Sequence, residues 1–241
     1  MTNTYEPERL STSQRRLSIL SWLLTNNRPK YFDNLFIQKY LFFYELTSFS
    51  EGKDYSFDYM RGYLRGPVFS EVYGDAKYRE QLFYRESDKA SATRDLFLVD
   101  ESIARFSSFM VSIFDNHDLS AFTHEFDVWK VKENQIQART SPQIPLSEDD
   151  ISQNDLSIIE TLREVYNDSY IRSLEILEFS KENQLGNERK LIFLITKDDL
   201  ARLEAENYEQ VLNQLINEAT MQNIENPVYI TFDEEEGFRI D

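Results

Sequence analysis

Apolar residues along most of this chain recur every three or four positions, which is the spacing of one face of an α-helix. The helix predicted after Asp33 is apolar over much of its circumference, so we expect it at the centre of the fold. Asp33 suits the N-cap of this helix because its carboxylate can accept a backbone N–H. The predicted helical segments are residues 17–24, 35–44, 103–114, 119–129, 156–166 and 171–179.

Glycine and proline mark the expected breaks between these helices. Pro29 disfavours helical geometry at the residue before it, so the first helix should end near residues 26–29. Gly66 accepts backbone angles that other residues resist, and Pro67 suits a first helical turn, so a short helix is predicted from Pro67 to about Tyr73. Two polar stretches are predicted to form a surface loop and a linker, respectively: residues 75–99 and residues 133–148.

The last quarter of the chain has a different pattern. Residues 190–196 (KLIFLIT) form an apolar run typical of a buried strand, and residues 228–232 (VYITF) alternate like a second strand. Thr196–Asp199 resembles a capping box ahead of a long helix over residues 200–219. A turn at 234–237 would fold the second strand back on 238–240. The predicted fold is mainly α, a helical domain followed by a small C-terminal α+β unit of strand–helix–strand type.

Charge distinguishes the two ends of the chain. The net charge is −17, from 26 basic and 43 acidic groups. Residues 1–135 hold 17 basic and 20 acidic groups, a net of −3, whereas residues 136–241 hold 9 and 23, a net of −14. Such a surface repels phosphate backbones, so direct binding to nucleic acid is not expected. It would attract a basic partner, although acidity that serves only solubility is an open alternative.

Several classes of protein are disfavoured by what the sequence lacks. There is no cysteine, which excludes disulfides, thiolate metal sites and thiol catalysis. The first ten residues are polar and charged, unlike a signal peptide, and the longest apolar runs are far shorter than the roughly 20 residues of a membrane span. We therefore expect a cytoplasmic protein that does not contact a membrane.

Three ordered segments carry a resemblance to a known family. They are residues 34–46 (NLFIQKYLFFYEL), residues 62–73 (GYLRGPVFSEVY) and residues 119–129 (LSAFTHEFDVW). Their motifs are Gln–Lys in an apolar helix, Gly–Pro–Val followed by Val–Tyr, and Leu–Ser, Thr–His and Trp after an amphipathic helix. In order and spacing they resemble the Panacea domain of SocA/GepA-like antitoxins, found in bacteria and phages, over residues 17–135.

The resemblance implies a protein-binding function. It implies a type II toxin–antitoxin antitoxin that neutralises a cognate toxin by direct binding, without enzymatic activity. Three alternatives stay open: an adaptor that delivers a toxin to a protease, a phage regulator that binds a host protein, and a hydrolase whose site no motif of the sequence reveals. The implied organisation is a Panacea-like core at 1–135, a linker with helices packed on the core at 136–186, and an acidic α+β extension at 187–241. Association of the chain with a second copy is also left open.

The residues of these motifs are expected to be mainly structural. Gln38–Lys39 is interpreted as a solvated or partly buried edge of its helix, and a hydrogen-bonded histidine is expected to fix the turn before the tryptophan. The full set of motif residues is Gln38, Lys39, Gly66, Pro67, Val68, Tyr73, His124 and Trp129. A separate acidic run, Glu234, Glu235 and Glu236, is either a solvated loop or a contact for a basic toxin.

No pattern in the sequence indicates catalysis or a cofactor. The two histidines, His117 and His124, are seven residues apart and lack the close pairing of HExxH-type metal sites. Gly66–Pro67 lacks the glycine spacing of a phosphate-binding loop. Acidic pairs such as Asp149–Asp150 and Asp198–Asp199 are expected at helix N-termini, where the helix dipole favours them. We therefore predict no enzymatic activity, no metal and no cofactor.

Overall fold

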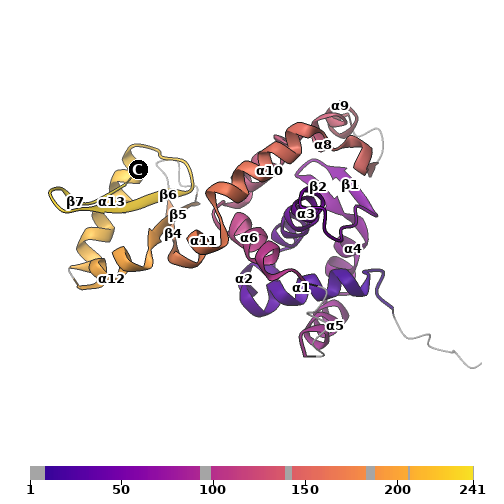
Figure 1. Ribbon diagram of the computed structural model, residues 1–241, viewed down its shortest axis with the longest axis horizontal. Helices are drawn as coiled ribbons and strands as arrows, with labels where there is room; N and C mark the ends of the chain where they lie inside the picture. Colours follow the sequence, from indigo (N-terminus) through magenta and orange to yellow (C-terminus); the bar gives the residue numbers. More distant parts are fainter. Residues whose placement is uncertain (1–8, 93–98, 139–142, 183–187, 206, 241) are drawn as a thin grey trace, which may run out of the picture.

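The computed structural model describes residues 9–92, 99–138, 143–182, 188–205 and 207–240. Over these ranges the protein is mainly helical, with a small sheet near its C-terminus, as the sequence predicts (Figure 1). Within the described part of the chain, no helix combines the length and the apolar character needed to cross a membrane.

Helix α3 (Asn34–Ser50) lies at the centre of the helical part. Its side chains from Phe36 to Ser48 are buried around the whole circumference, which confirms the expected central position. Asp33 is the predicted N-cap, and its carboxylate accepts the backbone N–H of Leu35 at 2.8 Å. The helices that contact α3 are α1 (Gln14–Asn26), α2 (Arg28–Tyr31), α4 (Ser70–Tyr78), α6 (Glu101–Ser112), α7 (Asn116–His124) and α10 (Gln153–Val165).

The predicted helices 17–24, 103–114, 119–129 and 156–166 are all present, as α1, α6, α7 with α8 (Asp127–Lys130), and α10. The first break lies at Asn27. Arg28 is helical, contrary to the expectation, because Pro29 occupies the first turn of α2, where its missing N–H costs nothing.

The segment around Gly66 is a β-hairpin, so the prediction of a helix starting at Pro67 is wrong. Strand β1 (Met60–Tyr63) pairs antiparallel with β2 (Gly66–Phe69), and β3 (Ile144–Pro145) pairs on the other side of β1. Helix α4 begins only at Ser70. The proline is tolerated in the strand because β2 is at the edge of the sheet and needs no ladder bond from it.

Two segments predicted to be irregular are largely ordered. Residues 75–92 complete α4 and form α5 (Glu80–Ala92), whose buried residues face α1 and α4, while residues 93–98 lie outside the described ranges. The expected linker at 133–148 contains α9 (Glu133–Gln137) and β3, and its residues 139–142 likewise lie outside. Polar composition misled the prediction because single apolar residues such as Phe83 and Ile136 are enough to anchor these elements.

The predicted helix over 171–179 is also wrong. Helix α11 ends after six residues (Asp168–Ser173) and is followed by strand β4 (Leu174–Glu182). Leu174 and Ile176 pack on the helical core, whereas Leu177 and Phe179 pack on the core of the C-terminal sheet. Apolar residues on both faces of one strand therefore imitate the spacing of a helix.

The C-terminal sheet has the strand order β4-β5-β6-β7. Strand β5 (Glu188–Thr196) is antiparallel to β4 and parallel to β6 (Val228–Asp233), and β6 forms the predicted hairpin with β7 (Gly237–Ile240). Both sequence-predicted strands are confirmed. The predicted long helix is two helices, α12 (Lys197–Ala205) and α13 (Tyr208–Met221).

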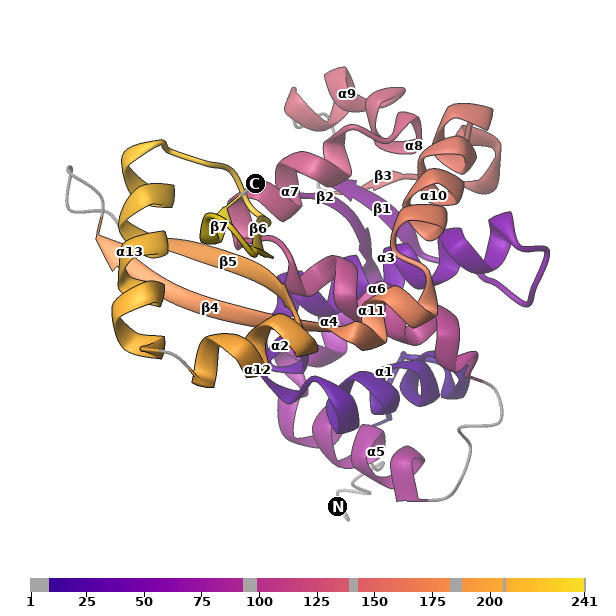
Figure 2. The same ribbon diagram turned by 60° about the vertical axis from the view of Figure 1, so that its left-hand side comes forward.

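The sheet also begins earlier than the expected boundary at 186–187. That boundary falls between β4 and β5, which pair over nine residues from Leu174↔Thr196 to Glu182↔Glu188. We therefore call residues 174–240 the sheet unit and residues 9–173 the helical unit. Figure 2 shows α12 and α13 on one side of the sheet, with the helical unit beyond the other.

Strand β5 explains why the segment KLIFLIT is apolar without alternation. Phe193 and Ile195 belong to the core under α12 and α13, whereas Leu194 belongs to the core of the helical unit. A strand covered on both faces needs apolar residues at successive positions. The two units are also joined by a hydrogen bond between the hydroxyls of Tyr166 and Tyr229.

Candidate functional site

The motif residues Gln38 and Lys39 hold the free edge of strand β2. The side-chain oxygen of Gln38 accepts the backbone N–H of Phe69 at 2.8 Å, and the Lys39 amine donates to the carbonyl of Pro67 at 3.2 Å. These two backbone groups would otherwise be unpaired, because β2 has a strand on one side only. Gln38 and Lys39 are 1% and 0% exposed, so the expectation of a solvated or partly buried edge is wrong. Both side chains are fully buried and pair with backbone groups that a neighbouring strand would otherwise pair.

Burial has a large effect on the ionisation of Lys39. It lowers the pKa of the amine well below its usual value of 10.5, because the charged form loses its hydration. A neutral amine still donates a hydrogen bond to Pro67. The Lys39 side chain is therefore a structural donor in the centre of the molecule.

Gly66 is required by the close approach of α3 and α7 to the hairpin. Its φ of +91° lies in a region that side chains rarely adopt. A Cβ atom added there would lie 2.3 Å from the Lys39 Nζ and 2.4 Å from the Thr123 Oγ1. The glycine of the Gly–Pro–Val motif thus leaves room for the lysine of the Gln–Lys motif, and it does not start a helix.

The third motif holds the turn of the same hairpin. The Trp129 indole N–H donates to the carbonyl of Tyr63 at 2.9 Å, and its ring stacks on His124 with centroids 3.9 Å apart. The His124 Nε2 is buried and has no hydrogen-bond partner among the described residues. Burial lowers the pKa of His124 below its usual 6.5, so the ring is neutral near pH 7. The structure places His124 by its stacking on Trp129, and the predicted hydrogen bond of this histidine stays a prediction.

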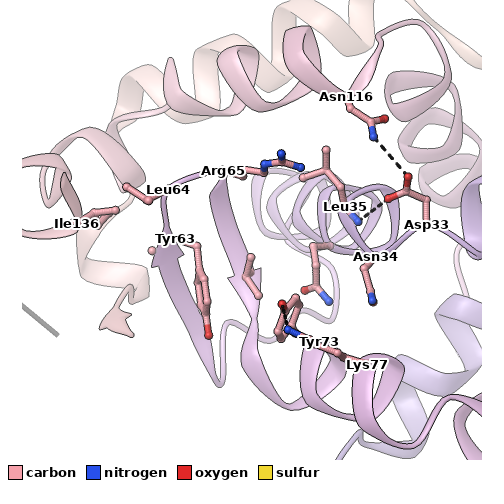
Figure 3. Close-up of a pocket in the computed structure, with 13 residues that line it drawn as sticks. Asp33, Asn34, Leu35, Tyr63, Leu64, Arg65, Tyr73, Lys77, Asn116 and Ile136 are labelled. Carbon is pink, nitrogen blue, oxygen red and sulfur yellow. Dashed lines mark hydrogen bonds between the residues drawn. The ribbon is translucent and has the colours of Figure 1, made fainter. Parts of the chain in front are cut away.

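The β1–β2 hairpin, the N-terminal part of α3 and helix α4 together surround a cavity of about 660 Å³ (Figure 3). Three motif residues, Gln38, Val68 and Tyr73, are among its lining. Asn116 and Ile136 lie at the sides of the cavity. The remaining lining residues come from the hairpin, from the two helices and from the N-cap of α3: Asp33, Asn34, Leu35, Gly62, Tyr63, Leu64, Arg65 and Lys77. We call this space the hairpin cavity.

Cationic and aromatic side chains dominate the polar part of the hairpin cavity. Arg65 extends from the turn between β1 and β2, and Lys77 lies beside Tyr73 on α4 (Figure 3). The Lys77 amine donates to the Tyr73 hydroxyl at 3.1 Å, and the rings of Tyr63 and Tyr73 are 5.9 Å apart. A cavity with these groups can bind an anion or a planar ring, and its size is that of a small-molecule site.

Other candidate residues lie away from this cavity. The side chain of His117 is 91% exposed, and its Nδ1 lies 3.4 Å from the Asp118 carboxylate. His124, in contrast, is stacked on Trp129 beside the hairpin. In the described part of the chain, no three His, Asp or Glu side chains are grouped as metal ligands. Glu234, Glu235 and Glu236 are exposed in the turn between β6 and β7, in the sheet unit.

Most residues of the lining were not among the predicted site residues, and four of those missed are Tyr63, Leu64, Arg65 and Lys77. The first three lie in the quoted segment GYLRGPVFSEVY, but the predicted helix began only at Pro67 and no element was predicted for residues 63–65. A Gly66–Pro67 pair between Tyr-rich alternating residues also fits a hairpin, and this signal was available. Nothing local links Lys77 to the hairpin, because that proximity is created by the turn from β2 into α4.

Comparisons with known proteins were made at three levels. No family model, no curated protein and no solved structure matched the chain.

Proposed function

We propose that this protein is the antitoxin of a type II toxin–antitoxin system and neutralises a cognate toxin by direct protein–protein binding. One observation supports the proposal above the others. The three segments that carry the resemblance are separated in sequence, yet their motif residues contact each other around the β1–β2 hairpin. Contact among the three segments is what a shared structural motif requires, and this supports the proposal.

In this proposal the shared helical unit supplies a rigid frame and the acidic sheet unit contributes to partner choice. Glu234, Glu235 and Glu236 project from a tight turn whose shape is set by Asp233, which accepts the backbone N–H groups of Glu235 and Glu236 at 2.8 and 3.1 Å. An exposed acidic turn on a defined hairpin attracts a basic surface and speeds association. The proposed partner is therefore a basic toxin, and the mechanism is stoichiometric blocking without chemistry.

The test is growth rescue together with direct binding. The product of the neighbouring gene is expressed from an inducible promoter, with and without this chain, and growth is scored. We expect arrest without the chain, rescue with it, and a stable complex of the two purified proteins by size-exclusion chromatography. A neighbouring product that is harmless, or one that arrests growth without binding this chain, would contradict the proposal.

The same experiment separates the adaptor alternative. A blocking antitoxin rescues growth while the toxin accumulates in the complex, and it does so in a strain lacking the main cytoplasmic proteases. An adaptor rescues growth only when the protease is present, and the toxin level falls. Immunoblots of the toxin in both strains therefore decide between blocking and delivery for degradation.

A further inference from the structure

Two residues that line the hairpin cavity carry a buried polar atom without a hydrogen-bond partner among the described residues, the Asn34 Oδ1 and the Gln38 Nε2. The side-chain oxygen of Gln38 accepts the Phe69 N–H, and this bond fixes the orientation of the amide because an N–H cannot face a second N–H donor. The Gln38 Nε2 is therefore a donor, and it has no hydrogen-bond partner among the described residues. Buried polar groups in folded proteins are nearly always paired, so an unpaired donor on a residue that lines a cavity points to an acceptor that the chain itself does not supply.

The cations of the cavity are also available to a ligand. Over the described ranges, neither Arg65 nor Lys77 lies within 4.0 Å of a carboxylate oxygen in an ion pair, although acidic groups outnumber basic ones by 43 to 26. The one carboxylate in the lining, Asp33, is occupied by the backbone N–H of Leu35 at 2.8 Å and by the Asn116 amide at 3.4 Å. Two exposed cations thus face a cavity in a strongly acidic protein.

The remaining lining suits a flat, apolar group. The rings of Tyr63 and Tyr73 are inclined by 40° at 5.9 Å, and both contribute to the cavity. Leu35, Leu64 and Val68 complete its apolar surface. Aromatic rings bind planar groups by stacking or edge contact over distances of about 4.5–7 Å between centroids.

We propose that the hairpin cavity binds a small planar anion. Its ring packs against Tyr63 and Tyr73, its anionic group pairs with Arg65 or Lys77, and one of its acceptor atoms receives the Gln38 Nε2–H. A volume of about 660 Å³ suits a ligand of one or two rings. This binding activity is independent of the proposed antitoxin function, because it depends on groups inside the helical unit only.

The ligand anion can be a carboxylate or a phosphate, and two probe pairs distinguish them. Binding of indole-3-acetate and of adenosine 5′-monophosphate to the full chain is measured by isothermal titration calorimetry, each beside its neutral counterpart, indole-3-acetamide or adenosine. We expect saturable binding of at least one anion at one site per chain, with its neutral counterpart at least about tenfold weaker, as the loss of a charge-assisted hydrogen bond implies. The anion that binds identifies the class.

Variants locate the binding in this cavity. Arg65→Ala and Lys77→Ala remove exposed side chains, and at least one should weaken the bound anion about tenfold. Arg85→Ala is the matched control, because Arg85 is 62% exposed on α5 outside the cavity, and it should bind normally. Gln38→Glu keeps the acceptor for Phe69 but replaces the free donor with an oxygen, so it should abolish binding if it folds.

Three results would overturn the proposal. They are the absence of saturable binding by both anions, equal binding of the charged and neutral probes, and unchanged affinity in both Arg65→Ala and Lys77→Ala. The two alanine variants carry the decision even if Gln38→Glu fails to fold, because both of their side chains are exposed and contribute little to folding.

Discussion

The helical unit and the sheet unit differ most in the polar groups that they bury. In the helical unit, Arg16, Lys39, Glu45 and Asp75 are each at most 3% exposed. Over the described residues 174–240, the only buried polar side chain is Asn226. The helical unit is therefore held by buried polar bonds as well as by apolar packing, whereas the sheet unit relies almost entirely on apolar packing.

The partners of these buried groups come from distant parts of the sequence. Asp75 accepts the backbone N–H groups of Ser11 and Thr12 at 2.7 Å each, more than 60 residues away. Glu45 pairs with Arg15 and accepts the N–H of Ser56 at 3.0 Å. Each bond fixes the position of one chain segment relative to another, so the helical unit is specified by a small number of long-range contacts that tolerate little change.

The core of the sheet unit is built from alternating positions on neighbouring elements. Its buried residues include Phe193 and Ile195 of β5, Val228 of β6, and Leu212 and Leu215 of α13. Such a core depends on the pattern and on total volume, and similar apolar side chains can replace each other at modest cost. The comparison predicts that substitutions affecting polar contacts should be more damaging in the helical unit.

The largest effect is expected for Trp129→Ala. Trp129 is 1% exposed, so truncation should lower the free energy of unfolding by about 3–5 kcal/mol, and it also removes the hydrogen bond from the indole N–H to the Tyr63 carbonyl. Phe193→Ala, in the core of the sheet unit, is the matched truncation and should cost a similar amount. Hydrogen exchange should show faster exchange in the β1–β2 hairpin for the first variant only. A Trp129→Ala protein that melts normally yet loses the toxin would place Trp129 in the binding surface.

The next largest loss of stability is expected for Gly66→Ala, and Gly237→Ala is its control because both glycines have a positive φ. Gly66→Ala strains the backbone by roughly 1–3 kcal/mol and also forces Lys39 and Thr123 aside. Gly237→Ala in the β6–β7 turn, at φ +79°, introduces comparable strain, but a Cβ there meets nothing within 4 Å. Urea unfolding should therefore show a larger loss for Gly66→Ala. Equal losses would mean that the Lys39 contact does not constrain the hairpin.

A smaller effect is the pH dependence that Lys39 gives to the free energy of unfolding. The unfolded chain binds a proton at this amine up to its usual pKa of 10.5, whereas burial lowers the pKa in the folded protein. Between these two pKa values the unfolded state holds more protons, so this group makes the free energy of unfolding rise with pH, by at most about 1.4 kcal/mol per unit. The contribution of Lys39 to the free energy of unfolding is complete above its pKa in the unfolded chain. It is lost as the pH falls through its pKa in the folded protein.

The measurement is urea unfolding from pH 7 to 9.5 for the wild type, Lys39→Met and Lys197→Met. The wild type should gain stability with rising pH relative to Lys39→Met. Lys197 is 56% exposed in its side chain, and its variant should follow the wild type. Parallel curves for the wild type and Lys39→Met would show that Lys39 keeps an ordinary pKa in the fold.

The smallest effect on folding is expected for charge reversal in the sheet unit. Replacing Glu234, Glu235 and Glu236 with Lys should leave the melting temperature nearly unchanged, because exposed charges contribute little to stability. It should slow association with a basic toxin, and added salt should slow the wild type similarly, since screening acts over about 8–10 Å.

The control for that prediction reverses three exposed acidic residues of the helical unit, Glu80, Asp88 and Glu101. Stopped-flow association rates and growth rescue are compared for both triple variants. If the two variants associate at equal rates, the acidic turn has no special part in binding and only the net charge matters.

Much of the local structure could be predicted from the sequence. The N-cap at Asp33, the central helix after it, the amphipathic helices α6 and α10, and strands β5 and β6 all follow from short-range periodicity. The failures share one cause. The segments 66–73 and 171–179 have apolar spacings that fit a helix and a strand equally well, and partners outside the segment select the strand.

The sequence predicted several residues of the candidate site but not their arrangement in space. The motif residues Gln38, Gly66 and Trp129 were identified, yet nothing local shows that they meet around one hairpin or that Arg65 and Lys77 face a cavity beside it. Burial of Gln38 and Lys39 was also missed, because a polar pair on a helix is ordinarily solvated.

The sequence by itself determined the mainly helical class, the mixed unit at the C-terminus and the unequal distribution of charge, because each depends on composition or on the spacing of near neighbours. Only the tertiary structure decided the edge pairing of β2, the conformation of Gly66 and the hairpin cavity. These depend on where α3 places the side chains of Gln38 and Lys39, almost 30 residues before the strand that they complete. Unpaired backbone groups at a strand edge must find partners, and the folded chain, not the local pattern, determines which side chains can reach them.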